Sequence, residues 1–317
     1  MRARSFVIAG LAAFSLVSMA APALAQAKAP VKTPVRAAYV PAVTWLPAWV
    51  AQDQGIFAKN GLDVTFTEIQ NLGLLPSTLG KQFDIAPSTP PDLIKAAANG
   101  INVVAVAGGF IESSDRRSIE VLTKADSGIK KPSDLTGKLI ATPALGSIMH
   151  VATLQWLKKN GVDPTSVRAV EVPFPNMSDQ LNSGRVAAVE AVQPFAGLMM
   201  KGGAITLGDP VLSIADPAMG TMWISDKAWA AAHKEVIAKW VASLDEAIAI
   251  IKQKPDSVRG SLAKYTKLKP EIAAGIPIPA YQATIAPEHL ATWIDVLRDM
   301  GQISAPVSAA NLVLSTK

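Results

Sequence analysis

Short apolar segments of strand character alternate with helical segments through residues 35–225 of this 317-residue chain. The strand segments are rich in Val, Ile and Ala, and most of the helical ones end at a glycine. This alternation predicts an α/β fold with mostly parallel strands and crossover helices. The predicted strands are residues 35–40, 64–68, 84–86, 103–107, 118–122, 139–142, 167–172, 188–192, 205–207 and 221–225. The predicted helices in this part are residues 46–54, 90–99, 147–160 and 177–184.

The last third of the chain has a different pattern. Helical segments are predicted at residues 233–252, 256–266 and 287–300, with Pro255 and Pro270 among the breaks between them. The chain is long enough for two lobes of ordinary domain size. We therefore expect two α/β lobes, with the helical C-terminal section packed on one of them.

Residues 1–25 have the pattern of a secretory signal peptide. A basic start is followed by an apolar run at residues 6–21 and by an Ala-Leu-Ala cleavage motif that ends at Ala25. The alternative, a membrane anchor, needs about 20 apolar residues and is not followed by a cleavage motif. We expect export to the periplasm, a mature chain that begins at Gln26, and a disordered polar leader at residues 26–34.

The composition narrows the classes of protein that this chain can belong to. It contains no cysteine, so it lacks the residue on which bacterial lipoproteins are acylated, and we expect a freely soluble periplasmic protein. Its formal net charge is only +5, and no basic run stands out. A nucleic-acid partner is therefore not expected.

Five motifs resemble, in their order along the chain, those of periplasmic solute-binding proteins. They are Gly55–Val64 (G-x-F-x-x-x-G-L-D-V), Gln82–Ala86 (x-x-D-I-A), Lys131–Lys138 (similar to DLKGK at its end), Gly146–His150 (G-S-x-x-H) and Leu181–Ala188 (L-x-x-G-x-V-x-A). The branch that they resemble binds aliphatic sulfonates, taurine, nitrate and thiamine-pyrimidine precursors. Two positions depart from the pattern: Ala187 stands where Asp is usual, and Gln193 where Glu is usual.

The resemblance implies a two-lobed periplasmic-binding-protein fold of the type II kind, which closes over a ligand like a Venus flytrap. It also implies the solute-binding subunit of an ABC importer, a monomer that delivers its solute to an inner-membrane permease. The implied division is lobe one at residues 35–110 and 222–317, lobe two at 120–214, and hinge crossovers at 111–119 and 215–221.

Candidate ligand-binding residues follow the carboxyl ends of strands, where open α/β sheets bind ligands. Trp45 either stacks on a ligand or packs in the core. Ser88 and Thr89 precede a helix start and either hold an anion or only cap the helix. Gly146 and Ser147 stand in the same position before the next helix.

The remaining candidates are weaker. His150 lies in the first turn of a helix, where a structural role is the alternative. Gln193 removes a negative charge from an expected cleft wall, and Phe195 lines either the cleft or the core. Arg116 and Arg117 either pair with an anionic ligand or belong to a solvated loop. We expect the solute to carry a negative group, held mainly by helix N-termini rather than by a salt bridge.

An enzymatic function is not expected, and neither a metal nor a cofactor is predicted. The chain has three histidines, no cysteine, and none of the HExxH, GxSxG or P-loop motifs. Fungal pyrimidine-precursor synthases share the fold but use a cofactor-bound lysine and a cysteine-rich loop, so an enzyme of that kind is the first alternative. A periplasmic sensor that binds the same sort of solute is the second.

Overall fold

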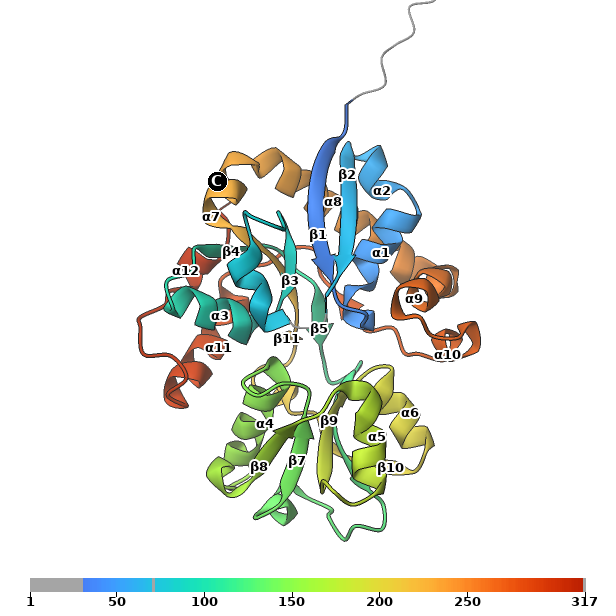
Figure 1. Ribbon diagram of the computed structural model, residues 1–317, viewed down its shortest axis with the longest axis vertical. Helices are drawn as coiled ribbons and strands as arrows, with labels where there is room; N and C mark the ends of the chain where they lie inside the picture. The colour runs from blue at the N-terminus through green and yellow to red at the C-terminus, as the bar shows by residue number, and fades with distance from the viewer. Residues whose placement is uncertain (1–30, 70–71, 316–317) are drawn as a thin grey trace, which may run out of the picture. The chain divides into compact units, whose positions relative to one another are not determined.

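The computed structural model describes residues 31–69 and 72–315, and residues Lys32–Lys317 form one compact unit (Figure 1). The predicted signal peptide lies outside the described residues. The first strand begins at Thr33, so the last two residues of the predicted leader belong to a strand instead. Within the described residues, no helix is long and apolar enough to span a bilayer.

We call residues 119–213 the small lobe. The large lobe consists of the elements from Thr33 through Ala107 and of those from Met222 onward. The strands of the large lobe are β1 (Thr33–Tyr39), β2 (Leu62–Glu68), β3 (Ala86–Ser88), β4 (Val103–Ala107) and β12 (Met222–Asp226). β1 pairs with β2 in parallel, and an isolated bridge from Ala37 to Ile85 connects β1 to the segment that leads into β3.

Four strands of the large lobe (β1, β2, β3 and β4) run in the same direction, as predicted, and β12 is the exception. β12 lies between β3 and β4 and is antiparallel to both. The reason is the path of the chain: β12 follows the second crossover, so it enters the sheet from the end that faces the small lobe. A pattern of alternating strands and helices does not reveal this return.

Helices cover the sheets of the large lobe and bury a continuous aromatic core. Trp240 stacks on Phe57 with ring centroids 4.7 Å apart and meets the edge of Trp223, whose ring in turn meets Trp45. The helices are α1 (Leu46–Asp53), α2 (Ile56–Lys59), α3 (Pro90–Ala98), α7 (Lys227–Ala232), α8 (Lys234–Gln253), α9 (Arg259–Thr266), α10 (Pro270–Ala274), α11 (Glu288–Asp299) and α12 (Ala309–Leu312).

The small lobe is built on a five-stranded mixed sheet in the order β10-β6-β9-β7-β8. Its residues alternate between two cores, as strand geometry requires: Val121 faces α4 and Leu122 faces α5 and α6. The elements are β6 (Ile119–Lys124), β7 (Leu139–Thr142), α4 (Ile148–Lys159), β8 (Arg168–Glu171), α5 (Phe174–Asn182), β9 (Ala188–Val192), α6 (Phe195–Lys201) and β10 (Ala204–Gly208).

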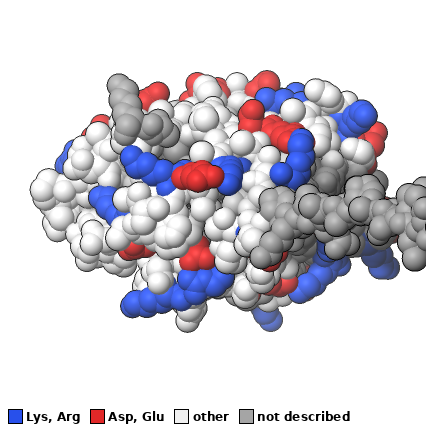
Figure 2. All heavy atoms as spheres, turned by 90° about the horizontal axis from the view of Figure 1, so that it is seen from above, with Lys and Arg blue, Asp and Glu red and all other residues white. Residues whose placement is uncertain are grey.

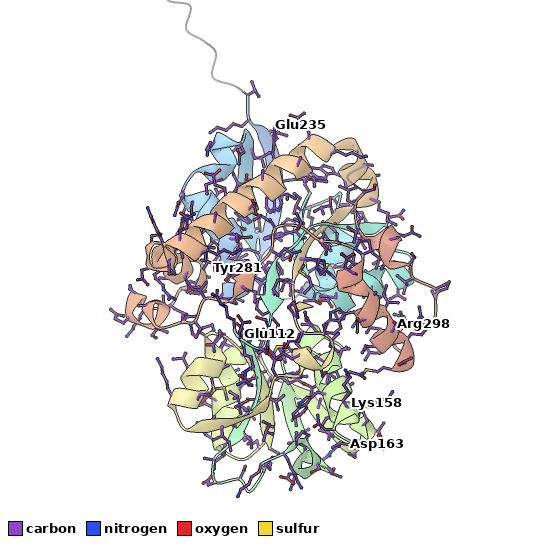
Figure 3. The ribbon with its side chains drawn as sticks, turned by 180° about the vertical axis from the view of Figure 1, so that it is seen from behind. Glu112, Lys158, Asp163, Glu235, Tyr281 and Arg298 are labelled. Atoms are coloured by element: carbon purple, nitrogen blue, oxygen red, sulfur yellow. The ribbon has the colours of Figure 1, made fainter. Side chains whose placement is uncertain are left out.

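Two chain crossovers connect the lobes, and they pair with each other. β5 (Phe110–Glu112) and β11 (Ala218–Met219) are antiparallel neighbours, and β13 (Ala280–Tyr281) pairs with the other edge of β5. We call this three-stranded sheet the crossover ribbon. Figure 3 shows Glu112 at the junction of the lobes, with Tyr281 on the side of the large lobe.

Candidate functional site

A cavity of about 620 Å³ lies between the lobes, and both lobes line it. Small-molecule sites are usually concave spaces of roughly 300–1,000 Å³. On the large-lobe side, the cavity is lined by the loop after β1, by residues 72–77, and by one face of α3. On the small-lobe side, it is lined mainly by residues 143–149, which connect β7 to α4.

The N-terminus of α3 offers fewer free N–H groups to an anion than the sequence predicts. Its first two helical residues, Pro90 and Pro91, have no N–H to offer. The third N–H, that of Asp92, already donates to the Thr89 hydroxyl. That hydroxyl donates in turn to the Asp92 carboxylate at 2.7 Å, which places a negative charge at the start of the helix. Thr89 lines the cavity, but its side chain caps its own helix.

Lys95 presents an ammonium group to the cavity one turn further along α3. Its Nζ crosses the cleft and donates to the carbonyl oxygen of Gly146 in the small lobe. Burial lowers the pKa of Lys95, and the nearby Asp92 carboxylate opposes that change. Burial also raises the pKa of Asp92. The site therefore contains a partly desolvated cation and a partly desolvated acid on one face of one helix.

The loop before α4 is held in shape by side chains from three directions. Gly146 adopts a left-handed conformation with φ of 72°, and its N–H donates to Nδ1 of His150 at 2.9 Å. The N–H of Leu145 donates to the Glu171 carboxylate at 2.8 Å. Ser147 caps α4, accepting from the His150 N–H at 3.5 Å. The N–H of Ser147, which shares its peptide group with the Gly146 carbonyl, donates to the Ala144 carbonyl at 3.1 Å and so holds the carbonyl that Lys95 contacts.

His150 supports this loop and does not line the cavity. Because its Nδ1 accepts a hydrogen bond from a backbone N–H, the ring must be neutral and carry its proton on Nε2. Burial lowers the pKa of His150, and the Lys95 ammonium lowers it further, which favours the neutral ring. This geometry favours a structural role for His150 over direct contact with a ligand.

The walls of the cavity are largely apolar. Trp45 lines it with one face while only 2% of its surface is exposed, since its ring packs edge-on against Trp223. The two roles considered for Trp45, cleft wall and core, therefore coexist. Leu74 from the large lobe and Leu145 from the small lobe also line the cavity and are 65% and 54% exposed.

Three other predicted residues lie off the cavity. Ser88 is fully buried in β3, where its hydroxyl donates to the carbonyl of Thr89. Gln193 is buried and accepts from the Gly197 N–H, so it closes the first turn of α6. Phe195 stacks on Phe174, and it is Phe174 that reaches the cavity.

Lys95, Asp92, Glu171 and Phe174 line the cavity but were missed by the sequence analysis. The sequence does contain a signal for Lys95 and Asp92. Thr89, Asp92, Lys95 and Asn99 recur at helical spacing, so a helix that begins at the cleft must present all four on one face. No comparable signal marks Glu171 or Phe174, because each reaches the cavity only through the packing of the small lobe.

The described residues contain no cluster of metal ligands, and one face of the molecule has mixed charge. No group of three His, Asp or Glu side chains clusters in residues 31–69 and 72–315. On the face seen in Figure 2, acidic side chains are interspersed among the basic ones. That pattern differs from the one-sided basic surface of nucleic-acid-binding proteins.

Comparison with curated proteins identifies two relatives. The chain is 23% identical over 251 residues to a protein of Brachyspira hyodysenteriae that is named as an ABC transporter periplasmic binding protein; the match covers 74% of this chain and 70% of that protein. It is 32% identical over 141 residues to a protein of Haemophilus influenzae that is named as a thiamine biosynthesis protein, with coverage of 44% and 43%.

Among solved structures, the fold is similar to that of the periplasmic aliphatic sulphonate binding protein SsuA of Escherichia coli. The TM-score is 0.75 at 18% identity, over 89% of this chain and 97% of that one. This likeness confirms the predicted fold class. Residues 43–258 match the model of the family described as NMT1/THI5 like, and since that span is more than half of the chain, the protein belongs to the NMT1/THI5-like family.

Proposed function

We propose that this protein is the solute-binding subunit of an ABC importer, working in the periplasm as a soluble receptor. The observation that carries the proposal is the cavity between the lobes, lined by both and spanned by the Lys95–Gly146 hydrogen bond. A receptor that closes on its solute needs this arrangement, because each lobe must contact the solute. The relative named as a periplasmic binding protein supports the same function.

The size and chemistry of the cavity favour an organic solute. Its volume corresponds to about twenty water molecules at roughly 30 Å³ each. Apolar walls from Trp45, Phe174 and Met149 suit a carbon skeleton, and Lys95 suits an anionic group. In this proposal Lys95 is the main group that binds the negative group of the solute. The expectation from the sequence was that two helix N-termini bind it.

The N-terminus of α4 retains a supporting role in this proposal. The N–H groups of Ile148 and Met149 in its first turn have no hydrogen-bond partner among the described residues, and both residues line the cavity. Unpaired N–H groups at a helix start favour an anion. The small lobe would then contribute N–H groups, and the large lobe an ammonium group.

A thermal-shift screen of small organic acids, amines and neutral solutes against the purified protein tests this function. A solute present at 1,000 times its Kd stabilises a protein by about 4 kcal/mol. For a chain of this size, that raises the Tm by about 8–16 °C. Small-angle scattering with the same solute should then show compaction. A set of hits with no compaction at saturation would contradict a receptor that closes.

An enzyme of the same fold is the second candidate, because one relative is named as a thiamine biosynthesis protein. The absence of cysteine argues against the cysteine-using enzymes that the fold resembles. Recovery of the bound solute after denaturation separates the two functions. A receptor returns the solute unchanged, whereas an enzyme returns a product. Stimulation of a reconstituted permease–ATPase by the loaded protein then separates import from sensing.

A further inference from the structure

We propose that Lys95 couples the charge of the solute to the closing of the lobes. In this inference, which rests on the proposed function, its ammonium group holds the Gly146 carbonyl across the cleft. The same ammonium offers its remaining N–H groups to an anionic group of the solute. One side chain then acts both as the latch between the lobes and as the residue that selects a negatively charged solute.

The donors of Lys95 are only partly used by the protein. A lysine ammonium has three N–H donors. Gly146 accepts one, and no ion pair within 4 Å joins Lys95 to an acid among the described residues. The nearby Asp92 carboxylate accepts instead from the Thr89 hydroxyl and lies at the helix start. Donors therefore remain for a group that lies in the cavity.

The partner of the latch is held in place by its own lobe. Gly146 adopts φ of 72°, which an L side chain rarely adopts, and a Cβ built there would lie 3.0 Å from Lys95 Nζ. The N–H of Ser147, in the same peptide group as the Gly146 carbonyl, donates to the Ala144 carbonyl at 3.1 Å and holds that peptide group in place. His150 fixes the peptide group before it by accepting from the Gly146 N–H, so His150 supports the latch without lining the cavity.

Desolvation explains why the latch depends on charge. Closing the cleft removes water from an ammonium that is half-buried, and burial favours the neutral amine. One neutral carbonyl compensates weakly for that loss, whereas an anionic group forms a charge-assisted hydrogen bond, which is roughly twice as strong. A solute with a negative group should therefore stabilise the closed form more than a neutral solute of the same size.

The latch can be tested without any solute. Because the chain has no cysteine, spin labels can be placed through Ser77→Cys on the large-lobe rim and Asn176→Cys at the start of α5. Pulsed EPR should show a longer mean distance in Lys95→Met than in the otherwise wild-type pair. Lys81→Met is the matched control, since that lysine is exposed on the same lobe and should leave the distance unchanged. Equal distances in Lys95→Met and the wild-type pair would overturn the latch.

The charge preference is tested with 1-hexanesulfonate and 1-hexanol, probes that share a carbon chain and differ in charge. Wild type should bind the sulfonate at least about ten-fold more tightly than the alcohol, as should Lys95→Arg, which keeps the charge. Lys95→Met should lose that preference while its circular dichroism spectrum stays unchanged. Equal affinity of the sulfonate for wild type and Lys95→Met, or no binding of the sulfonate to wild type, would refute the charge role.

The two measurements distinguish failure of this inference from failure of the proposed function. The distance measurement uses no solute and no permease, so it reports on Lys95 even if the protein has another function. Conversely, if Lys95→Met behaves as wild type in both measurements while a solute still compacts the protein, the receptor function stands and only the role of Lys95 is wrong.

Discussion

The two lobes differ in what they bury. Six of the seven tryptophans belong to the large lobe, and only Trp156 belongs to the small one. The large lobe has one continuous aromatic core, which also includes Ile148 and Met149 at the start of α4. The small lobe has two thinner cores, one on each face of its sheet. The large lobe therefore holds most of the aromatic packing, and the start of α4 packs against it.

Their buried acids differ as well. In the large lobe, the buried Asp84 forms an ion pair with Arg36 at 2.6 Å. In the small lobe, Glu190 is fully buried, and neither of its carboxylate oxygens has a hydrogen-bond partner. At the junction, Glu112 and Asp209 are both buried, and each has one carboxylate oxygen without a partner. A buried acid is stable when it is paired, whereas an unpaired one makes stability depend on pH.

The largest effect is expected from the aromatic core. Trp240→Ala removes a fully buried side chain that contacts Phe57 and Trp223, and should cost about 3–5 kcal/mol. Because the large-lobe core extends into α4, both lobes should unfold together. Urea unfolding should therefore give coincident curves by tryptophan fluorescence, which reports the large lobe, and by far-UV circular dichroism. Two separate unfolding curves would show that the small lobe unfolds independently of the large one.

The next largest effect on stability is expected from Glu112 and Asp209, the carboxyl pair at the junction of the lobes. Burial and the neighbouring Asp209 carboxyl raise the pKa of Glu112, while the backbone N–H groups of Ser118 and Ile119 oppose the rise. Burial also raises the pKa of Asp209, as does the negative charge of Glu120, which pairs with Arg117 at 3.6 Å. The folded pair therefore retains a proton at neutral pH that the unfolded chain has lost.

The sign of the pH dependence follows from these raised pKa values. Stability from this pair is fully present below the unfolded pKa of about 4.5 and is lost as the pH rises toward the folded pKa. Glu112→Gln keeps an acceptor for Ser118 and supplies a donor to Asp209. It should stabilise the protein by about 2–3 kcal/mol at pH 9 and by little at pH 4. A calorimetric Tm for Glu112→Gln that falls with pH as steeply as in wild type would contradict this account.

Glu190 should make the stability depend on pH in a lower pH range than Glu112 and Asp209 do. Burial raises the pKa of Glu190 to about 7. Stability is therefore lost between about pH 4.5 and 7 and is level above that range. Glu190→Gln should gain about 1–2 kcal/mol at pH 8, because the amide is neutral but must still find partners. If the stability gain of Glu190→Gln keeps growing above pH 8, a group other than Glu190 causes it.

The smallest losses of stability are expected at the two helix starts that face the cavity, those of α3 and α4. Thr89 both accepts from and donates to Asp92, whereas Ser147 makes one long bond of 3.5 Å. Thr89→Ala should cost about 1 kcal/mol and Ser147→Ala about 0.5 kcal/mol. Chemical denaturation of both variants, with Ser77→Ala as a control at an exposed site, measures the difference. If Ser147→Ala costs more than Thr89→Ala, the small lobe depends more on its cap than its geometry indicates.

The sequence predicted most elements because their signals are local. Helix α3 is predicted at 90–99 and found at Pro90–Ala98, and β9 is predicted at 188–192 and found at Ala188–Val192. Apolar periodicity, proline starts and glycine stops mark such elements without reference to the rest of the chain. The short helix α6 was missed, because the side chain that accepts a hydrogen bond in its first turn is Gln193, before the N-cap Pro194, rather than a Ser, Thr, Asp or Asn at the N-cap.

The candidate site was predicted less well because it is assembled from distant segments. Trp45, Thr89, Gly146 and Ser147 do line the cavity, since each follows a strand end that faces the cleft. The Lys95–Gly146 contact joins residues 51 positions apart in different lobes, and no local pattern encodes it. Ser88 shows the opposite error: one position along a strand turns a side chain to the other face, from cavity to core.

The crossover ribbon limits how this molecule can move and how its sequence can change. Glu112 pairs with Ala218 and Ile111 with Met219, so the two connections are hydrogen-bonded to each other and cannot slide or twist independently. Any bending at this ribbon must therefore involve both connections together. A single inserted residue in one connection would shift its register and turn every following side chain to the opposite face. Insertions and deletions should therefore accumulate in surface loops while both crossovers keep their lengths.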